Sequence, residues 1–140
     1  MGKWCLYVEP EKIDECVLKI KNGVIQGKIK QAKTNIIQRI DGSIYEDKHP
    51  EHTGKHGVEF YVEDSTDIDE IKNLYKTLVE LDIINQDENI SFKPDVFTAY
   101  DINEYLIDSN TIKLNEDMEL FVMIKDKLQA RLPPDFVEIR

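Results

Sequence analysis

"VEFYVEDSTDIDEIKNLYKTLVELDII", residues 58–84, carries the two patterns that decide the fold of this chain. Residues 58–64 alternate hydrophobic with polar or aromatic side chains, which is the period of a strand with one buried face. Residues 65–84 place hydrophobic side chains at helical spacing, after acidic residues that the helix dipole favours. Thr66 and Asp69 predict a capping box at the start of this helix. A strand followed by an amphipathic helix predicts a sheet with a helix packed on it.

Toward the N-terminus, the sequence predicts a strand, a helix, a second strand and a loop. Residues 3–8 are rich in aromatic and branched side chains and predict a strand. Pro10 predicts the start of a helix, and Gly27 predicts its end. Residues 32–40 predict the second strand, and the polar residues 41–57 predict a long loop. The buried face of the helix is predicted from its hydrophobic spacing to contain Ile13, Val17, Ile20 and Val24.

Toward the C-terminus, the sequence predicts extended segments. Residues 89–102 predict an extended segment that Pro94 interrupts, and residues 111–114 and 120–126 predict two further strands. Two amphipathic helices each need a surface to cover. The chain therefore predicts an α+β fold, with a mostly antiparallel, mixed sheet and two main helices packed on one face.

Length, charge and cysteine content narrow the classes of function. A chain of 140 residues suits a single domain, residues 1–140, with one core. The formal net charge of −10 argues against duplex nucleic acid as a partner. Residues 1–40 nevertheless carry eight basic and four acidic residues, a net charge of +4, so a local basic patch is compatible with the sequence.

The sequence predicts a cytoplasmic protein without a membrane segment. It contains no run of 18 apolar residues and no signal-peptide pattern at its start. Two cysteines, Cys5 and Cys16, do not make a disulfide framework, which favours a reducing compartment. No cofactor is expected.

All three histidines fall in "HPEHTGKHG", residues 49–57. His49, His52 and His56, with Glu51 nearby, are residue types that bind zinc. The spacing is not that of a helical pair, and Pro50 and a glycine make the backbone irregular. We therefore prefer a solvated loop, and keep a zinc site and an active-site contact as alternatives.

The stretch "GKIKQAK", residues 27–33, places three lysines near a glycine turn. Lys28, Lys30 and Lys33 together offer a site for an anion such as phosphate, and a solvated charged turn is the alternative. Lys33 differs because it lies in a predicted strand, between Ala32 and Thr34. If it points into a cleft, it can serve as a general base.

Aromatic residues and a cysteine are further candidates. Paired aromatic side chains can clamp a planar base, but more often they fill a core, which we expect here. Cys5 can act as a nucleophile only beside a basic partner, and otherwise is a small buried side chain. The aromatic residues concerned are Trp4, Tyr7, Phe60, Tyr61, Phe92, Phe97 and Tyr100.

Three stretches resemble a known family: residues 2–34, "FYVED" at 60–64 and "FKPDVFTAYDI" at 92–102. The shared marks are Gly2-Lys3-Trp4, Gly27, Ala32-Lys33 and Lys93-Pro94-Asp95. The family is the one named for a basophilic-leukemia-expressed protein, and the resemblance covers about residues 2–102. Its archaeal and bacterial members often carry a phosphothreonine-lyase-domain label. The resemblance implies a fold like that of the cap-binding translation initiation factor, with a curved antiparallel sheet backed by helices.

The lyase label implies a β-elimination that removes phosphate from phosphothreonine. In such lyases a lysine takes the α-proton, a histidine acts as the acid, and cationic residues hold the phosphate. The resemblance matches Lys33 to the base, Lys3 to a lysine on the first strand and Tyr61 to a strand tyrosine. The acid position is Cys5 in this chain. At two positions where such lyases carry a cationic residue, this chain has an acidic one: Glu63 and Asp101.

These observations predict a small binding or interaction domain with a lysine-lined pocket for an anion. Lys3, Lys33 and Tyr61 are expected to line the pocket, and the expected ligand is a phosphorylated peptide or another small anion. A lyase with an altered site, using Lys33, Lys3, Tyr61 and Cys5, is the second interpretation. A zinc-binding protein through the histidine loop is the third.

Overall fold

A computed structural model describes residues 1–36 and 55–133, and its strands form one antiparallel sheet. The sheet has the order β2-β3-β1-β4-β5, and each described pair of neighbouring strands is antiparallel. The strands are β1 (Gly2–Val8), β2 (Ala32–Ile36), β3 (His56–Val62), β4 (Ser91–Pro94) and β5 (Ile107–Asp108). The first strand therefore lies in the middle of the sheet, between β3 and β4.

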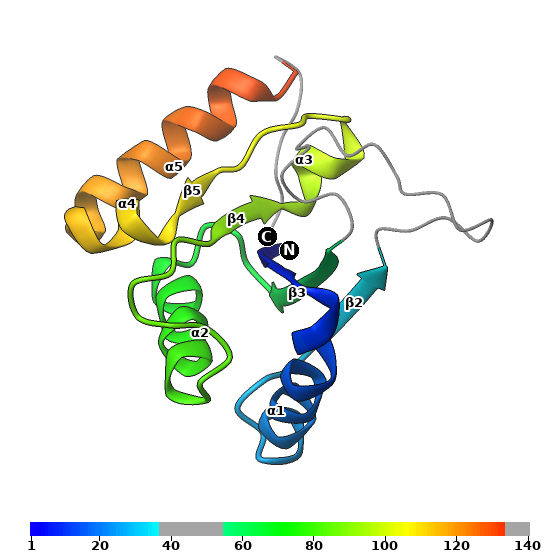
Figure 1. Cartoon of the computed structure of the whole chain (residues 1–140). Coiled ribbons are helices and arrows are strands. Elements are labelled where there is room, and N and C mark those ends of the chain that lie inside the picture. The colour runs from blue at the N-terminus through cyan, green and yellow to red at the C-terminus, as the bar shows by residue number, and fades with distance from the viewer. Residues whose placement is uncertain (37–54, 134–140) are drawn as a thin grey trace.

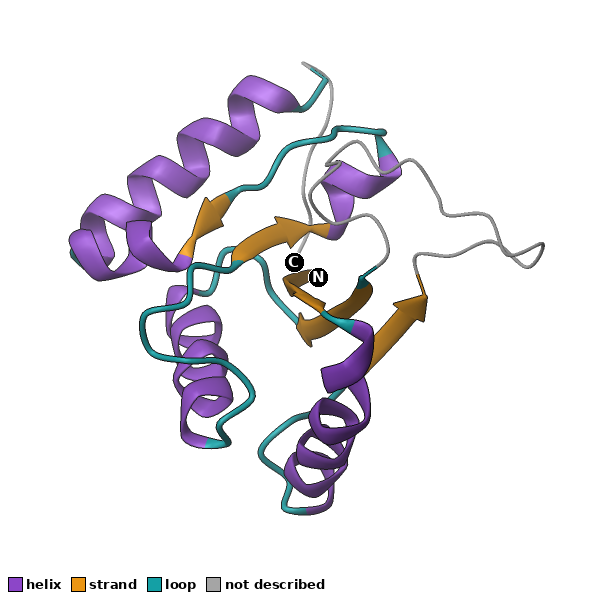
Figure 2. Ribbon diagram, in the orientation of Figure 1, coloured by secondary structure: helices purple, strands orange, loops and turns teal. Residues whose placement is uncertain are grey.

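The helices lie mainly on one side of this sheet. They are the short 3₁₀ helix η1 (Pro10–Lys12), α1 (Ile13–Ile25), α2 (Ile68–Glu80), α3 (Asp95–Ala99), α4 (Ser109–Leu114) and α5 (Asp117–Arg131). Figures 1 and 2 show the sheet as a curved layer, with α1, α2 and α5 along its outer side. The α+β class with helices packed on one face of a curved sheet is confirmed, and α5 joins the two main helices that were expected.

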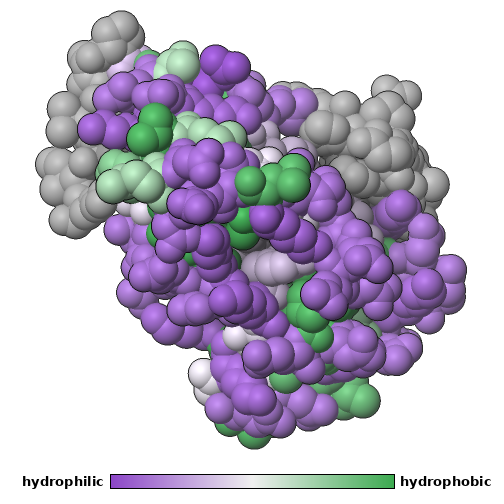
Figure 3. Space-filling model, turned by 90° about the vertical axis from the view of Figure 1, so that its left-hand side faces the viewer, coloured by the Kyte–Doolittle hydropathy of each residue, from purple (hydrophilic) through white to green (hydrophobic). Residues whose placement is uncertain are grey.

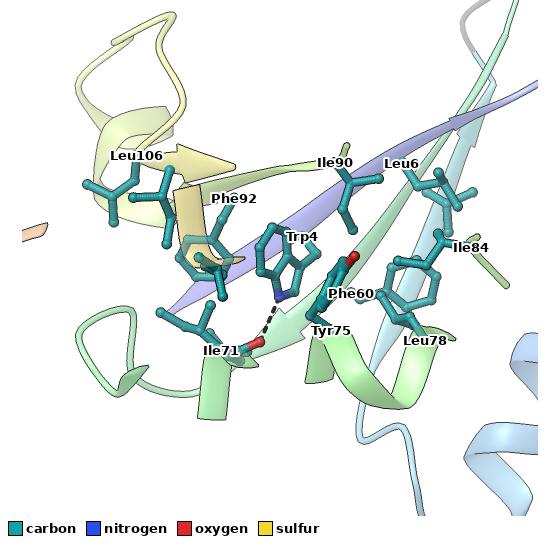
Figure 4. Close-up of a cluster of buried hydrophobic side chains, with 14 of the residues drawn as sticks. Trp4, Leu6, Phe60, Ile71, Tyr75, Leu78, Ile84, Ile90, Phe92 and Leu106 are labelled. Atoms are coloured by element: carbon teal, nitrogen blue, oxygen red, sulfur yellow. Dashed lines mark hydrogen bonds between the residues drawn. The ribbon is translucent and has the colours of Figure 1, made fainter. Parts of the chain in front are cut away.

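The core fills the space between the sheet and these helices, and Trp4 lies at its centre (Figure 4). Trp4 has no exposed surface, and its indole N–H donates a hydrogen bond to the carbonyl oxygen of Ile71 at 3.0 Å. Its ring contacts Phe92 edge-on, with 5.4 Å between the ring centroids, and Tyr75 at 5.7 Å. Trp4 is therefore a core residue, so it is not available to stack on a base.

Two of the expected C-terminal strands are wrong, because residues 111–114 and 120–126 are helical. Asp108 caps α4 by accepting a hydrogen bond from the amide of Thr111 at 2.8 Å. Glu116 and Glu119 form a capping box at the start of α5. A short apolar run fits a strand and a buried helix equally well, and here the caps and the core decide for helix. Residues 95–99, also expected to be extended, form α3.

The start of α2 also differs from the prediction. Asp67, and not Thr66, is the N-cap, and its carboxylate accepts a hydrogen bond from the amide of Glu70 at 3.2 Å. Thr66 is buried, and its hydroxyl donates to Asp64 at 2.7 Å. The predicted capping box is therefore wrong by one residue, although the helix itself is correct.

The buried face of α1 is rotated relative to the prediction. Cys16, Ile20 and Gly23 are its buried residues, whereas Val24 is 45% exposed. A Cβ atom on Gly23 would lie 2.7 Å from Ile29 Cδ1, so the glycine lets the helix approach its neighbours. Gly27, at φ 73°, follows the helix as expected.

Candidate functional site

The face of the sheet opposite the core is polar, and its residues come from all five strands. Strand alternation and register place one row across the sheet: Lys33, Glu59, Cys5, Ser91 and Asp108. A second row contains Tyr61, Lys3 and Lys93. We call these eight residues the polar face. None of the long helices α1, α2 and α5 covers it in Figure 1.

Lys3 lies at the centre of the second row. Its ammonium is 3.5 Å from Asp95 Oδ1 and 3.5 Å from the hydroxyl of Thr98, at the start and end of α3. It also lies 5.9 Å from the ring centroid of Tyr61, within range of a cation–π interaction. The Lys3 side chain is only 12% exposed. Its ammonium is therefore held between β1, β3 and α3.

Asp95 provides a counter-charge to Lys3, but their contact does not have the geometry of a hydrogen bond. Its Oδ1 atom is buried and makes no hydrogen bond within the described residues, although it lies 3.5 Å from the Lys3 ammonium. The contact is thus an ion pair but not a hydrogen bond. A buried oxygen of this kind normally has a partner, so hydrogen-bonding capacity remains beside Lys3.

Lys93 lies directly opposite Lys3 on the neighbouring strand β4. Lys3 directly precedes the core residue Trp4, and Lys93 directly follows the core residue Phe92. Strand alternation therefore places both lysine side chains on the polar face. Like charges directly opposite each other in an antiparallel pair are destabilising. The two strands nevertheless place two lysine side chains next to each other on the polar face.

Tyr61 and Glu59 form a second interacting pair on β3. The phenol of Tyr61 donates a hydrogen bond to Glu59 Oε2 at 2.6 Å. Burial, the hydrogen bond to Glu59 and its negative charge together raise the pKa of Tyr61 well above its ordinary value. Tyr61 is therefore a neutral hydrogen-bond donor near pH 7, and its hydroxyl proton is directed toward Glu59.

Cys5 lies opposite Glu59 and is buried, with 8% of its surface exposed. Burial and then the charge of Glu59 raise the pKa of its thiol to about 12, against the opposing effect of Lys3 and Lys93. A thiol that stays protonated at pH 7 is a poor nucleophile. In this environment Cys5 offers a small polar contact.

The sheet brings together four predicted site residues and leaves two others apart. Lys3, Cys5, Tyr61 and Lys33 share the polar face, where Lys33 is solvent-exposed and opposite Glu59. Lys28 and Lys30 instead line a hollow of about 510 Å³ next to α2, which Tyr61 also lines. Its other charged residues are all acidic, and the ammonium of Lys30 lies 3.7 Å from the carboxylate of Glu63.

Sequence reasoning missed Lys93 and Glu59 as site residues. Lys93 appeared only as part of a family mark, and Glu59 only as a polar position in an alternating strand. Strand alternation was the available signal, because Glu59 lies two residues before Tyr61 and Lys93 directly follows the apolar Phe92. The pairing of Lys93 with Lys3 depends on the register between β1 and β4, which has no local signal.

The histidine prediction falls mostly outside the described residues, which do not include His49 and His52. His56 belongs to β3, where it is half-buried and pairs with Val8 on β1, so it is not part of the expected loop. Within residues 1–36 and 55–133, no three His, Cys, Asp or Glu side chains are grouped to hold a metal ion. The zinc site through all three histidines stays a prediction.

No helix in the described part of the chain is both long enough and apolar enough to span a bilayer.

Comparison with known proteins agrees with the resemblance noted from the sequence. No curated protein matches this chain. A family model described as "Basophilic leukemia-expressed protein Bles03" matches residues 1–101, which include β1 to β4, α1 to α3 and every polar-face residue except Asp108. Since the match covers well over half of the 140 residues, the chain belongs to the Bles03 family.

Proposed function

We propose that this domain binds a small phosphorylated ligand on its polar face and does not turn it over. The observation that carries the proposal is the pairing of Lys3 with Lys93 across β1 and β4. A phosphate between the two ammonium groups would accept charge-assisted hydrogen bonds, which are about twice as strong as neutral ones. The net charge of −10 favours a phosphorylated peptide or a small anion over duplex nucleic acid.

The surroundings of Lys3 suit an anion that also accepts or donates hydrogen bonds. The hydroxyl of Thr98 is 3.5 Å from the Lys3 ammonium, and the carboxylate of Asp95 is equally close. A protonated phosphate oxygen or a peptide N–H can donate to the Asp95 carboxylate, whose side chain is 38% exposed. The mixture of charges therefore favours a phosphorylated peptide over a bare multivalent anion.

The lyase reaction is the second candidate, because Lys3, Cys5, Lys33 and Tyr61 share one face as the resemblance requires. Three features make binding the better proposal. Lys33 is exposed to solvent, and the thiol at the acid position has a pKa of about 12. Glu63, at a position where the lyases carry a cation, pairs instead with Lys30.

Buried residues of the domain bear on the proposed compartment and on the analogy with the cap-binding initiation factor. Cys5 and Cys16 are both free and buried, which fits the proposed reducing cytoplasm. A fold related to the cap-binding initiation factor stays part of the proposal, but base stacking on Trp4 does not, because Trp4 has no exposed surface.

The test of binding is amide chemical-shift mapping of isotope-labelled protein with a phosphothreonine peptide. Shifts are expected at Lys3, Tyr61, Lys93 and Thr98. Lys93→Gln is expected to weaken binding about tenfold, since one hydrogen bond to a charged group contributes about 1.5 kcal/mol. Lys21→Gln, an exposed lysine on α1, is the matched control and should bind as the wild type does.

Two results would reject the binding proposal. One is the absence of shifts at millimolar peptide, and the other is equal weakening by Lys93→Gln and Lys21→Gln. Phosphate release from the same peptide, lost about 10²–10⁴-fold in Lys33→Ala, would replace binding by the lyase reaction.

A further inference from the structure

Asp95 places a negative charge beside the two lysines that face each other on β1 and β4. It directly follows β4, and Oδ1 of its carboxylate lies 3.5 Å from the ammonium of Lys3. Burial is the main cause that raises the pKa of Cys5 and of Tyr61, and the charge of Asp95 adds to it in both. Its charge therefore acts on the polar face, although Asp95 lies beyond the strand. An anion that Lys3 binds also approaches the carboxylate of Asp95.

The charges around Lys3 are balanced within the described residues. Lys3 and Lys93 supply two positive charges. Glu59 and Asp95 supply two negative ones. A doubly charged phosphate would leave an excess of two negative charges, whereas a singly charged phosphate would leave an excess of one. Repulsion between like charges is stronger where solvent is partly excluded, and the Lys3 side chain is only 12% exposed. The balance therefore favours the singly charged form.

A proton on the phosphate would also supply a hydrogen-bond donor to Asp95. A carboxylate accepts hydrogen bonds without donating any, and a fully ionised phosphate does the same. A singly protonated phosphate can donate its O–H to Asp95 while its other oxygens accept from the lysines. Oδ1 of Asp95 is buried, but the side chain is 38% exposed, so the donor would meet the remainder of the carboxylate.

We propose that Asp95 makes the polar face select a phosphate group that carries one proton, and therefore a single negative charge. This inference rests on the proposed function, because it names the form of phosphate that the same site binds. Asp95 is then a specificity-determining residue of that site. The second ionisation of a phosphate monoester has a pKa of about 6, so about three quarters of a phosphothreonine peptide carries the proton at pH 5.5 and about 3% at pH 7.5.

Other effects of pH have to be separated from this one. Cys5 and Tyr61 stay neutral between pH 5.5 and pH 7.5, because burial raises the pKa of Cys5 to about 12 and that of Tyr61 well above its ordinary value. Much of the remaining surface is hydrophilic, as Figure 3 shows for the side of α4 and α5, and the net charge is −10, so acid makes any anion bind better. The charged or titratable groups around Asp95 are Lys3, Cys5, Glu59, Tyr61, Lys93 and the α-amino group of Met1.

The experiment therefore compares two peptides of one sequence, carrying phosphothreonine or O-sulfothreonine. The sulfate ester has a single negative charge and no proton at either pH, so it cannot donate to Asp95. Isothermal titration calorimetry at pH 5.5 and pH 7.5 measures the dissociation constants, and amide shifts show whether each peptide binds on the polar face. The phosphothreonine peptide is expected to bind about 25-fold tighter at pH 5.5, and the sulfothreonine peptide to change by less than about threefold.

Asp95→Asn is the matching change in the protein. Asparagine keeps the shape of the side chain, removes its charge and offers an N–H that donates to an ionised phosphate. The variant is expected to bind the phosphothreonine peptide at least about tenfold tighter than the wild type at pH 7.5, and to lose the preference for pH 5.5. Asp14→Asn, at an exposed position in the first turn of α1, is the matched control and should keep the wild-type pH dependence.

The outcomes distinguish this inference from the proposed function. Binding on the polar face that is equal at both pH values, or tighter at pH 7.5, would overturn the role of Asp95 and leave phosphate binding in place. The same holds for an equal effect of pH on the two peptides, and for an unchanged effect in Asp95→Asn. A phosphothreonine peptide that binds at neither pH would reject both proposals. The comparison of peptides uses the wild-type chain, so it is decisive even if Asp95→Asn is less stable.

Discussion

At the scale of single residues, β1 gives adjacent side chains opposite environments. Trp4 is fully buried and bonded to the backbone of α2, whereas Lys3 and Cys5 on either side of it belong to the polar face. This alternation means that one strand supplies both the centre of the core and the centre of the candidate site. Substitutions one residue apart are therefore expected to have different consequences, on stability in one case and on binding in the other.

Gly2→Ala is expected to destabilise the protein by about 1–3 kcal/mol, as overpacking of a core usually does. A Cβ atom there would lie 2.5 Å from Cζ of Phe92, and this ring has no exposed surface into which to move. Urea unfolding measures the change. Gly27→Asn is the control, because its site has open space and asparagine tolerates φ 73°. Wild-type stability in Gly2→Ala would contradict the packing of Phe92 on β1.

Cys5 is expected to react slowly with iodoacetamide and to gain rate about tenfold per pH unit up to pH 10. Only the thiolate reacts, and the pKa of about 12, raised mainly by burial, leaves a fraction of about 10⁻⁴ ionised at pH 8. Mass spectrometry of the separate Cys5 and Cys16 peptides measures both rates. A plateau near pH 8–9 for Cys5 would show an ordinary, exposed thiol.

At the scale of elements, acidic caps mark where the helices α2, α4 and α5 begin. Asp67, Asp108 and Glu116 each accept a hydrogen bond from an amide in the first turn of the helix that follows. Such caps contribute about 1 kcal/mol each, and they compete with the strand propensity of nearby branched residues. For α4, which has six residues, this contribution is a large share of what defines the element.

Asp108 is expected to make the fold less stable at acidic pH. Burial raises the pKa of its carboxyl, but hydrogen bonds from Thr111 and Asn89 outweigh this, so the pKa in the folded state lies below its ordinary value. A lowered pKa stabilises the fold above the unfolded value of about 4, and this contribution is lost as the pH falls through the folded value.

The comparison for Asp108 is Asp108→Asn, since asparagine is also a good N-cap but does not titrate. Urea unfolding at pH 7 and pH 3 is expected to show a smaller loss of stability in the variant than in the wild type. An equal loss in both proteins would show that Asp108 contributes nothing to the acid dependence.

At the scale of the whole molecule, the core extends past the part of the chain that defines the family. The family match ends at residue 101, but six buried core residues follow it: Leu106, Ile107, Ile112, Leu120, Ile124 and Leu128. Lys72 on α2 also pairs with Asp117 on α5. The described residues 102–133 therefore contribute to the same core as the part that the family model matches. One domain over residues 1–140 stays a prediction.

A fragment of residues 1–101 is accordingly expected to lose cooperative unfolding. It would expose the core side of β4 and α2 that α5 covers, and the burial of one large aliphatic side chain contributes about 1.5–3 kcal/mol. Circular dichroism during thermal melting measures this. Leu120→Ala in the full chain is the milder comparison, with an expected loss of about 2–5 kcal/mol. A sharp transition in the fragment would mean that α5 is an addition to a complete domain.

Much of the first two thirds could be predicted from the sequence. Strands at 3–8 and 58–64, a helix after Pro10 and a helix within residues 65–84 were predicted, because each pattern repeats over several residues and has a turn or cap near its ends. The helices at 109–114 and 117–131 were not, since residues 120–124 are continuously apolar and have no single period.

The sequence by itself determined the α+β class, the resemblance to the family, and the side of its strand that Tyr61 occupies. These follow from local period and from short motifs, which act over a few residues. Only the tertiary structure decided that β1 lies between β3 and β4, that Lys93 faces Lys3, and that α5 completes the core. Strand order and register depend on which hydrophobic surfaces can be buried together across the whole chain, and that choice has no local signal.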